Sequence, residues 1–501
     1  MKIISHCKRA TFLFLSCLFL FLNACKSDRT FDEVLYKASK NKIYKEIDTA
    51  ELADVIEAKI KDSKKLANPK FLLSFYNRNG FQPVLLNQYL PDDQLKDLSH
   101  YLKEVENHGL SKQTFDTDNY LAQLERVLNG DAITTIDEAY EAIALLEIQT
   151  AENLLNYSNT LNYGLIDPTK VFKRYYMETQ RPDTNSMYEV LATKDLKTYL
   201  DSIQPKSEDY KILQKALASS IVAPGKSEDE TKKTIKANLE RLRWKHSYDS
   251  TNMVYVNIPS FKLTLIKEGK PVKEIITVVG TGRNNSGNDK ISKYSKPVTD
   301  APHSHETPVL SSLMHSVQVN PVWNIPKSIA SKEILGHVQN DRFYLVNNGI
   351  EVLEDGKVID SDSIDWSSIS QDNLPFRFRQ KPGDDNALGK IKFLFKNNSA
   401  VYLHDTPAQA AFDRDIRASS HGCVRVKEPL DLAHFIFGDS DKFRLAKSEI
   451  EGTNTSAKDI ALDQKVTVVL DYVTTVVKDG KIEFFPDIYG LDIVLYTHLM
   501  K

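Results

Sequence analysis

The hydrophobic pattern of the chain changes its period once, between residues 222 and 230, and this change limits the fold to one with two unlike halves. From Glu51 to Ala218 the apolar residues recur mostly at helical spacing, as in the segment from Ile136 to Ile148. A loop with Pro and Gly and one short helix follow, and then come short β-branched and aromatic runs separated by turn sequences such as KEGK and KDG. The pattern predicts an α+β chain, with a mostly helical N-terminal domain before a β-rich C-terminal domain.

Composition agrees with a globular protein of two or three domains. The chain has 501 residues, of which 41% are hydrophobic and 27% are charged. Lys and Arg number 65 against 68 Asp and Glu, so the formal net charge is -3. A chain without a basic excess is not expected to bind a polyanion, and we predict no nucleic-acid partner.

The N-terminus has the pattern of a secretory signal. A basic start precedes an apolar run that is too short to span a membrane comfortably. The sequence LNAC, Leu22 to Cys25, resembles the lipobox of bacterial lipoproteins, which implies a signal peptide over 1–24 and lipid on Cys25. We therefore expect an exported, periplasmic protein anchored to the outer membrane, with residues 25–50 as a tether. The alternatives are an uncleaved anchor helix and a plain secretory signal.

Cysteine usage singles out one residue. The four cysteines are Cys7, Cys17, Cys25 and Cys423, and the first three lie in or next to the signal. The processed chain would keep one free thiol, Cys423, in a compartment where disulfides form. An unpaired thiol in an exported protein favours a reactive role.

The residues around Cys423 leave three interpretations open. His421 is two residues earlier, so it shares the face of Cys423 on an extended segment. His404 ends the strand-like run AVYLH, where a rigid strand could present it to a substrate. The three residues could form a nucleophile and base, a zinc site that lacks an evident fourth ligand, or part of an ordinary core.

A resemblance favours the first interpretation. The segment Val401–Ala433 resembles the active-site segment of the bacterial L,D-transpeptidases. Further blocks resemble, in order, the large exported subfamily with a helical scaffold; these are NLERLRW, TPVLSS, NPVWNIPKSIASKEIL and NALGKIKFLF. The resemblance implies a scaffold domain over 51–230 and a catalytic domain over 231–501, with a capping insertion at about 327–382. The peptidoglycan-binding module that many relatives carry between these domains is not found here.

The resemblance assigns five catalytic positions. Cys423 is the nucleophile, and His404 is the general base and later the acid, oriented by the main-chain carbonyl of Asp405. Gly422 allows a tight turn, so that its N–H and that of Cys423 point at the developing oxyanion. His421 supports the oxyanion or the substrate.

Four further residues are expected at the substrate. Arg425 shares the face of Cys423 and would bind a stem carboxylate, although an ion pair with Glu428 is the alternative. Trp323 and Tyr402 are expected to line the cleft. Arg417 lies in the same motif region and is also expected at the substrate. A position on the surface of a helix is an equally good interpretation for it.

The resemblance implies cell-wall biogenesis and a role in cell shape as the function. The enzyme would form a thioester with a stem tetrapeptide, release D-Ala and join position-three diamino acids of neighbouring peptidoglycan stems. No metal or organic cofactor is expected, and carbapenems would acylate the thiol. Two alternatives are an L,D-carboxypeptidase and a non-catalytic wall-binding lipoprotein.

Overall fold

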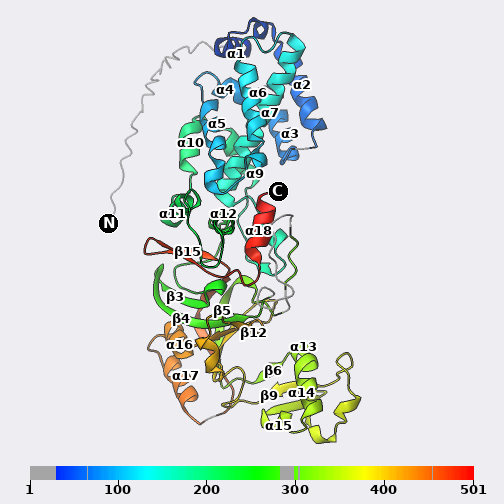
Figure 1. The fold of residues 1–501 in the computed structure, drawn as a ribbon, viewed down its shortest axis with the longest axis vertical. Helices are drawn as coiled ribbons and strands as arrows, with labels where there is room; N and C mark the ends of the chain where they lie inside the picture. The colour runs from blue at the N-terminus through cyan, green and yellow to red at the C-terminus, as the bar shows by residue number, and fades with distance from the viewer. Residues whose placement is uncertain (1–29, 65, 283–297, 303–304, 454) are drawn as a thin grey trace, which may run out of the picture.

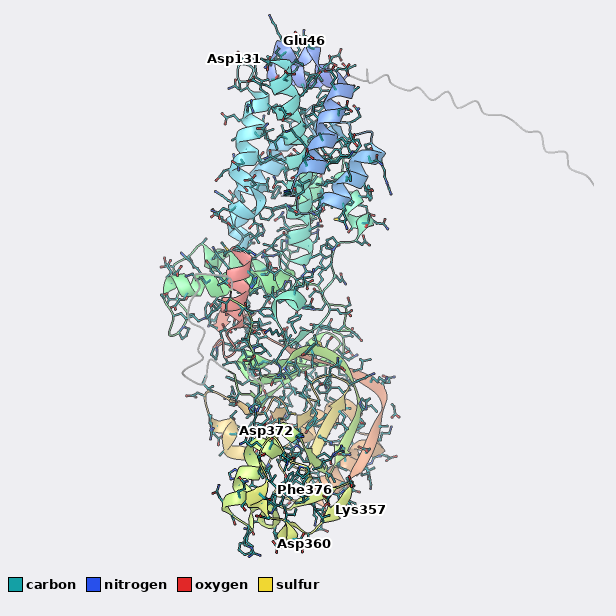
Figure 2. All side chains as sticks on the ribbon, turned by 90° about the vertical axis from the view of Figure 1, so that its right-hand side faces the viewer. Glu46, Asp131, Lys357, Asp360, Asp372 and Phe376 are labelled. Carbon is teal, nitrogen blue, oxygen red and sulfur yellow. The ribbon has the colours of Figure 1, made fainter. Side chains whose placement is uncertain are left out.

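The computed structural model describes residues 30–64, 66–282, 298–302, 305–453 and 455–501. The molecule is elongated, with a helical region at one end, a β-sheet region in the middle and a small mixed unit at the other end (Figure 1). Figure 2 shows Glu46 and Asp131 at the helical end, far from Lys357 and Asp360. The expected signal and the lipidation site at Cys25 lie outside the described residues. Over the described ranges, no helix combines the length and the apolar character needed to span a membrane.

The helical region packs around the long helix α7. Its helices are α1 Phe31–Ser39, α2 Thr49–Asp62, α3 Pro69–Arg78, α4 Val84–Tyr89, α5 Leu95–Lys103, α6 Thr117–Leu128, α7 Ile136–Tyr163, α8 Pro168–Val171, α9 Thr184–Leu191, α10 Leu196–Ser202, α11 Glu208–Leu217 and α12 Glu228–Arg243. Thr135 caps α7 by accepting the Glu138 N–H. The fully buried Glu147 of α7 accepts the N–H groups of Leu85 and Leu86 at 3.0 and 2.9 Å. It thereby satisfies two of the backbone donors that the start of α4 leaves without a helical partner.

The predicted tether over 25–50 is wrong for its described part. Phe31, Leu35 and Tyr44 are buried in the core of the helical region. Helix α1 carries apolar residues at helical spacing, and burying them is worth about 2 kcal/mol for each large side chain. The folded scaffold therefore begins near Phe31 and not at residue 51.

The central region is one β-sheet that closes on itself, because β14 pairs with both β2 and β5. The strand order is β1-β5-β10-β11-β13-β4-β3-β2-β14, and β12 pairs with β4. The strands are β1 Tyr175–Tyr176, β2 Met253–Asn257, β3 Lys262–Lys267, β4 Lys270–Gly280, β5 Val309–Val319, β10 Ile391–Phe395, β11 Leu403–His404, β12 Ala418–Ser420, β13 Val424–Val426 and β14 Lys458–Asp471. Helices of this region are α16 Pro429–Phe437, α17 Asp441–Glu451 and α18 Leu491–Leu499.

Two predicted hairpin turns are confirmed. Glu268 and Gly269, between β3 and β4, both have positive φ, at 51° and 73°. Asp479 and Gly480 repeat this pattern between β15 Thr475–Lys478 and β16 Lys481–Phe484. Two consecutive residues with positive φ make the turn whose twist matches antiparallel strands, and glycine adopts that conformation without strain.

The small unit at the far end has its own sheet and core. Its strands are β6 Trp323–Ile325, β7 Ile350–Glu354, β8 Lys357–Ile359 and β9 Arg377–Gln380, in the order β6-β9-β7-β8. Its helical segments are α13 Lys327–Ile329, a π-helical turn over Ala330–Ile334, α14 Leu335–Asn340 and α15 Tyr344–Asn347. We call residues 323–380 the cap. It starts a few residues before the expected insertion at 327, because β6 pairs with β9.

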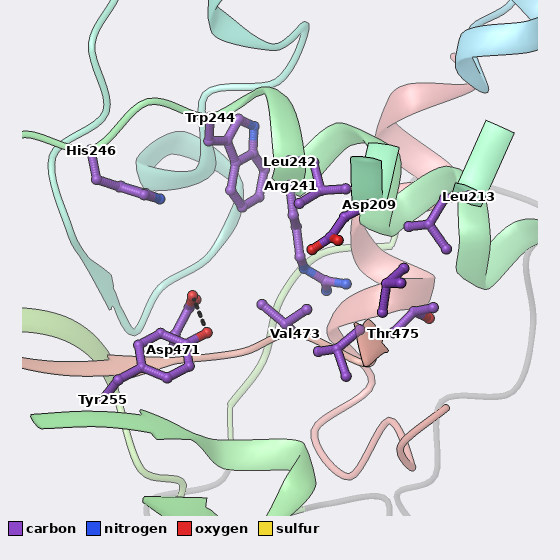
Figure 3. Close-up of a pocket in the computed structure, with 12 residues that line it drawn as sticks. Asp209, Leu213, Arg241, Leu242, Trp244, His246, Tyr255, Asp471, Val473 and Thr475 are labelled. Carbon is purple, nitrogen blue, oxygen red and sulfur yellow. Dashed lines mark hydrogen bonds between the residues drawn. The ribbon is translucent and has the colours of Figure 1, made fainter. Parts of the chain in front are cut away.

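Helix α12 joins the scaffold to the sheet. Apolar residues of α11 and α12 pack against the β15–β16 hairpin, so the expected boundary at residue 230 falls inside a continuous helix. Arg241 of α12 forms an ion pair with Asp492 of α18 at 2.5 Å, and both side chains are almost fully buried. A cavity of about 290 Å³ lies beside this pair, where the Tyr255 hydroxyl donates to Asp471 at 2.9 Å (Figure 3). We call this region the junction.

Candidate active site

Two short parallel strands bring the predicted thiol and imidazole to one face of the sheet. In the register of β11 and β13, Leu403 pairs with Val424 and His404 pairs with Arg425. Both apolar residues are fully buried in the core. Because side chains alternate along a strand, Cys423, His404 and Arg425 face the opposite side, where all three line one cavity. The expectation that Arg425 shares the face of Cys423 is confirmed.

This catalytic cavity has a volume of about 430 Å³ and is enclosed by three parts of the chain. The sheet contributes the strand-end residues, the cap contributes Trp323 and Lys332, and the segment between α8 and β1 contributes Arg174. Tyr402 and His421 also line it. The wall positions predicted for Trp323 and Tyr402 are therefore observed.

Cys423 is a partly exposed free thiol at this cavity. Burial raises the pKa of the thiol to about 11, against the opposing effects of hydrogen bonding with Tyr402 and of the positive charges on Arg425 and Lys392. The group is therefore a neutral thiol at neutral pH, and it needs a base to become a nucleophile.

His404 is almost fully buried and is held by the main chain. Its Nδ1 makes a short hydrogen bond with the carbonyl oxygen of Asp405, as the sequence predicts. Since a carbonyl only accepts, Nδ1 carries the proton and Nε2 keeps its lone pair. Burial and the charges of Arg425 and Lys392 lower the His404 pKa to about 3, so the ring is neutral and can accept a proton.

The described residues include no hydrogen bond between His404 and Cys423, which lie diagonally across the neighbouring strands. Hydrogen bonds of this kind often tighten only when substrate is bound. The Asp405 carboxylate faces away from the chemistry and accepts the Lys390 N–H at 2.9 Å. Gly389 is required beside it, because φ is +60° there and a Cβ would collide with that carboxylate. Asp405 thus acts on His404 through its main chain.

The prediction that the Gly422 N–H serves an oxyanion is wrong in this structure. That N–H donates to the Ser420 hydroxyl at 3.1 Å, and the same hydroxyl donates to the Cys423 carbonyl at 2.5 Å. The Gly422 carbonyl accepts from the Thr307 hydroxyl at 2.9 Å. Gly422 is needed for its φ of +113°, which other residues rarely adopt. Within the described ranges the Cys423 N–H has no partner, so it is the backbone donor left for an oxyanion.

His421 contacts the cap and not the thiol. Its Nε2 lies 2.7 Å from Oε1 of Glu333, on the π-helical turn, and its ring centroid is 4.6 Å from that of His305. His305 also lines the cavity. The zinc grouping of His404, His421 and Cys423 does not form. Among the described residues, the ligand-type side chains that converge are His305, Glu333 and His421.

The two predicted arginines differ. Arg425 makes no ion pair within the described part of the chain, with Glu428 or any other acid, and its buried Nε has no hydrogen-bond partner. Arg417 does not line the cavity. Its guanidinium lies 5.3 Å from the centre of the Phe261 ring and donates to the Arg414 carbonyl, and its buried Nε, like that of Arg425, has no hydrogen-bond partner among the described residues. Its role at the substrate stays a prediction.

Four residues near the cavity were not predicted. Lys392 pairs with His404 across β10 and β11, and its Nζ lies 5.6 Å from the centre of the Tyr402 ring. Arg174, His305 and Glu333 come from loops and turns far away in the sequence. For Lys392, the alternation of apolar and polar residues along GKIKFLFKNN could have indicated which face of the strand it occupies. Arg174, His305 and Glu333 come near the cavity only through the tertiary fold, so no local sequence pattern could have indicated their position.

Comparisons with known proteins agree with this geometry. Residues 251–442 match the model of the L,D-transpeptidase catalytic domain, and residues 70–217 match the model named Scaffold domain. A curated Haemophilus influenzae protein named "Putative L,D-transpeptidase" is 31% identical over 318 residues, which are 63% of this chain and 60% of that protein. The chain thus spans about three fifths of the length of this relative. The predicted order of a helical domain before a strand-rich domain is confirmed.

Proposed function

Because residues 251–442 match the model of the L,D-transpeptidase catalytic domain, we propose that this chain cross-links peptidoglycan through a thioester at Cys423. The observation that carries the proposal is the placement of a free thiol, a neutral buried imidazole and an arginine without an ion pair on one face of β11 and β13. These groups supply a nucleophile, a base and a carboxylate-binding group within one cavity.

The first half-reaction consumes a stem tetrapeptide. Sγ of Cys423 attacks the carbonyl carbon of the position-three diamino acid, and the thiol proton moves to Nε2 of His404. The Cys423 N–H stabilises the oxyanion that forms. When the C–N bond breaks, the amine of D-Ala takes the proton from His404, and a thioester remains.

The second half-reaction joins two stems. The side-chain amine of a position-three diamino acid on a neighbouring stem attacks the thioester and passes a proton to His404. The C–S bond breaks, and the leaving Cys423 thiolate takes the proton back. The enzyme returns to its neutral thiol and imidazole, and a 3-3 cross-link has formed.

The charges at the catalytic cavity support an anionic peptide as substrate. Arg425, Arg174 and Lys332 line it, and Lys392 lies next to it. The side chain of Arg425 has no acid to pair with among the described residues and can bind a stem carboxylate through its planar fork. The cap covers the cavity with Trp323, Ile329 and Pro326, which limits the access of water to the thioester.

Product analysis tests this proposal. The full-length protein would be incubated with a purified disaccharide-tetrapeptide, and the products would be separated and identified by mass spectrometry. We expect cross-linked dimers and free D-Ala from the wild type, and neither from Cys423→Ala or His404→Ala. Folding of both variants would be checked by circular dichroism.

Other products would identify the alternatives. Tripeptide and D-Ala without dimers, even at high acceptor concentration, would contradict the transpeptidase proposal and establish a carboxypeptidase. Unchanged tetrapeptide with a folded wild-type protein would favour a wall-binding protein that keeps the fold. Acylation of Cys423 by a carbapenem would give a further check on the thiol.

Export and anchoring remain part of the proposal. The LNAC sequence supports lipid on Cys25, and the Phe31 start of the scaffold leaves only a few residues between lipid and domain. Incorporation of radiolabelled palmitate into the wild type and not into Cys25→Ala would support periplasmic, membrane-anchored localisation. A wild type that takes up no palmitate contradicts it.

A further inference from the structure

We propose that His305, Glu333 and His421 form a zinc site that fastens the cap to the rim of the catalytic cavity. The proposal is independent of the transpeptidase chemistry, because it rests on these three side chains alone. Two of them belong to the catalytic domain, and Glu333 belongs to the cap. It also departs from the sequence-based expectation that the protein binds no metal.

The three ligand atoms lie at distances close to those that a zinc ion requires. One atom from each side chain lies within 4.8 Å of the other two, and Nε2 of His421 is 2.7 Å from Oε1 of Glu333. Zn–N and Zn–O bonds of about 2.0–2.1 Å in a tetrahedron place ligand atoms about 3.3 Å apart. The observed range brackets this value, so small side-chain rotations would complete the site.

The chemistry of the set fits zinc and excludes the cations that prefer oxygen ligands alone. Two imidazoles and one carboxylate are the ligands of many zinc sites that keep a fourth position for water. Calcium and magnesium take oxygen ligands and would leave both imidazoles unused. The ring centroid of His305 lies 4.6 Å from that of His421, which itself pairs with Glu333, so both imidazoles lie at the same carboxylate.

The backbone holds His305 in place. Thr307, two residues after His305, donates its hydroxyl to the Gly422 carbonyl at 2.9 Å, and the same hydroxyl accepts the Gly280 N–H at 2.8 Å. The His305 carbonyl passes so close to Gly280 that a Cβ there would collide with it. A main chain fixed in this way positions the ring before a metal arrives.

Glu333 sits on an unusual element. The π-helical turn Ala330–Ile334 is a rare conformation that occurs frequently at functional sites. The side chains of Glu333 and His421 are 42% and 36% exposed, so a solvent ion can reach them. Zinc bound here would join the cap to the residue two positions before Cys423, and would hold the cap over the cavity.

Zinc titration of the full-length protein tests the site. The protein would be stripped with a chelator and titrated with Zn²⁺ by calorimetry in a Cys423→Ala background, which removes the thiol as a competing ligand. We expect one zinc per chain, and a loss of affinity of at least about tenfold for each of Glu333→Gln, His305→Gln and His421→Gln. The matched control is His434→Gln, which removes another histidine beside a carboxylate, Asp439 at 2.8 Å, where the described residues offer no third ligand.

Two readouts separate this site from other zinc binding. Co²⁺ added in place of zinc should give the visible spectrum of a four-coordinate nitrogen and oxygen site, with no thiolate charge-transfer band in the wild type. Zinc should raise the melting temperature of the wild type and leave that of folded Glu333→Gln unchanged. Absence of zinc binding in the Cys423→Ala background, or an affinity in the three ligand variants that is unchanged from that of the Cys423→Ala parent, would overturn the proposal.

Discussion

Buried ionisable side chains have partners inside the protein in the scaffold and its junction, whereas the arginine at the catalytic cavity has no acidic partner among the described residues. In the first region, Arg241 pairs with Asp492 and Glu147 accepts two backbone N–H groups, and all are almost fully buried. In the cavity, Arg425 has no ion pair within the described residues, and Cys423 is a neutral thiol. Both regions contain a cavity (Figure 3 shows the junction). The arginine at the junction cavity, Arg241, has a carboxylate partner, although its Nη2 makes no hydrogen bond, whereas Arg425 at the catalytic cavity has no carboxylate partner among the described residues.

This difference in pairing distinguishes residues that stabilise the fold from residues that can act on a substrate. A buried charge that is paired inside the protein contributes to the fold, and removing its partner is costly. A cation beside a cavity without a protein partner is available to a ligand. Substitutions in the scaffold and junction should therefore change the free energy of unfolding. Substitutions in the catalytic cavity should change kcat/KM.

The largest effect on unfolding is expected at the junction. Asp492→Ala leaves the Arg241 guanidinium buried without its carboxylate, and should lower the free energy of unfolding by about 3–5 kcal/mol. Asp431→Ala is the control, because its pair with Lys273 is exposed and worth about 0–1 kcal/mol. Urea denaturation measures both. Equal effects would remove the distinction between buried and exposed pairs.

The scaffold should lose stability as the pH rises. Burial raises the pKa of Glu147 from 4.5 to about 7, so the folded state holds this proton more tightly than the unfolded state. Its stabilising effect is complete below pH 4.5 and is lost as the pH rises through 7, which amounts to about 3 kcal/mol. Denaturation at several pH values checks this. Glu147→Gln should flatten the dependence over that range, and an unchanged slope in this variant would contradict the assignment.

Arg425 should affect catalysis without affecting the fold. Arg425→Gln should lower kcat/KM about 10- to 100-fold through loss of a charge-assisted contact to substrate, and leave the melting temperature almost unchanged. Arg417→Gln is matched in chemistry but lies off the cavity, and should leave kcat/KM close to that of the wild type. Steady-state kinetics compares the two. A similar loss in both variants would argue against substrate binding by Arg425.

The smallest effect is expected from pH on catalysis near neutrality. The His404 pKa is about 3 and the Cys423 pKa is about 11, so both groups keep their neutral forms between these values. kcat/KM should therefore vary by no more than about twofold between about pH 5.5 and 8, once substrate ionisation is accounted for. An ascending limb near 6.5, the ordinary value for histidine, would show that His404 titrates like an exposed imidazole.

Local patterns predicted more of the sheet than of the cap. The shared face of Cys423 and Arg425 follows from strand alternation, and the β3–β4 turn follows from the Glu268–Gly269 pair. His305 and Glu333 could not be predicted, because they meet only when the cap packs beside the sheet. The same applies to the Gly422 N–H, whose direction depends on the Ser420 hydroxyl.

The scaffold start was missed for a different reason. Phe31 and Leu35 lie in a lysine-rich stretch, and its overall polarity hid a short apolar face that the structure buries. Helical spacing of a few apolar residues was therefore the informative signal, and composition was the misleading one.

The thioester can be sought by intact-mass spectrometry of the full-length protein after brief exposure to disaccharide-tetrapeptide, without an acceptor. We expect a covalent adduct with the mass of the substrate less D-Ala, located on the peptide that contains Cys423. The adduct should be absent from Cys423→Ala and strongly reduced in His404→Ala. An adduct on another residue, or turnover of the tetrapeptide by folded Cys423→Ala, would contradict the thioester and with it the proposed function.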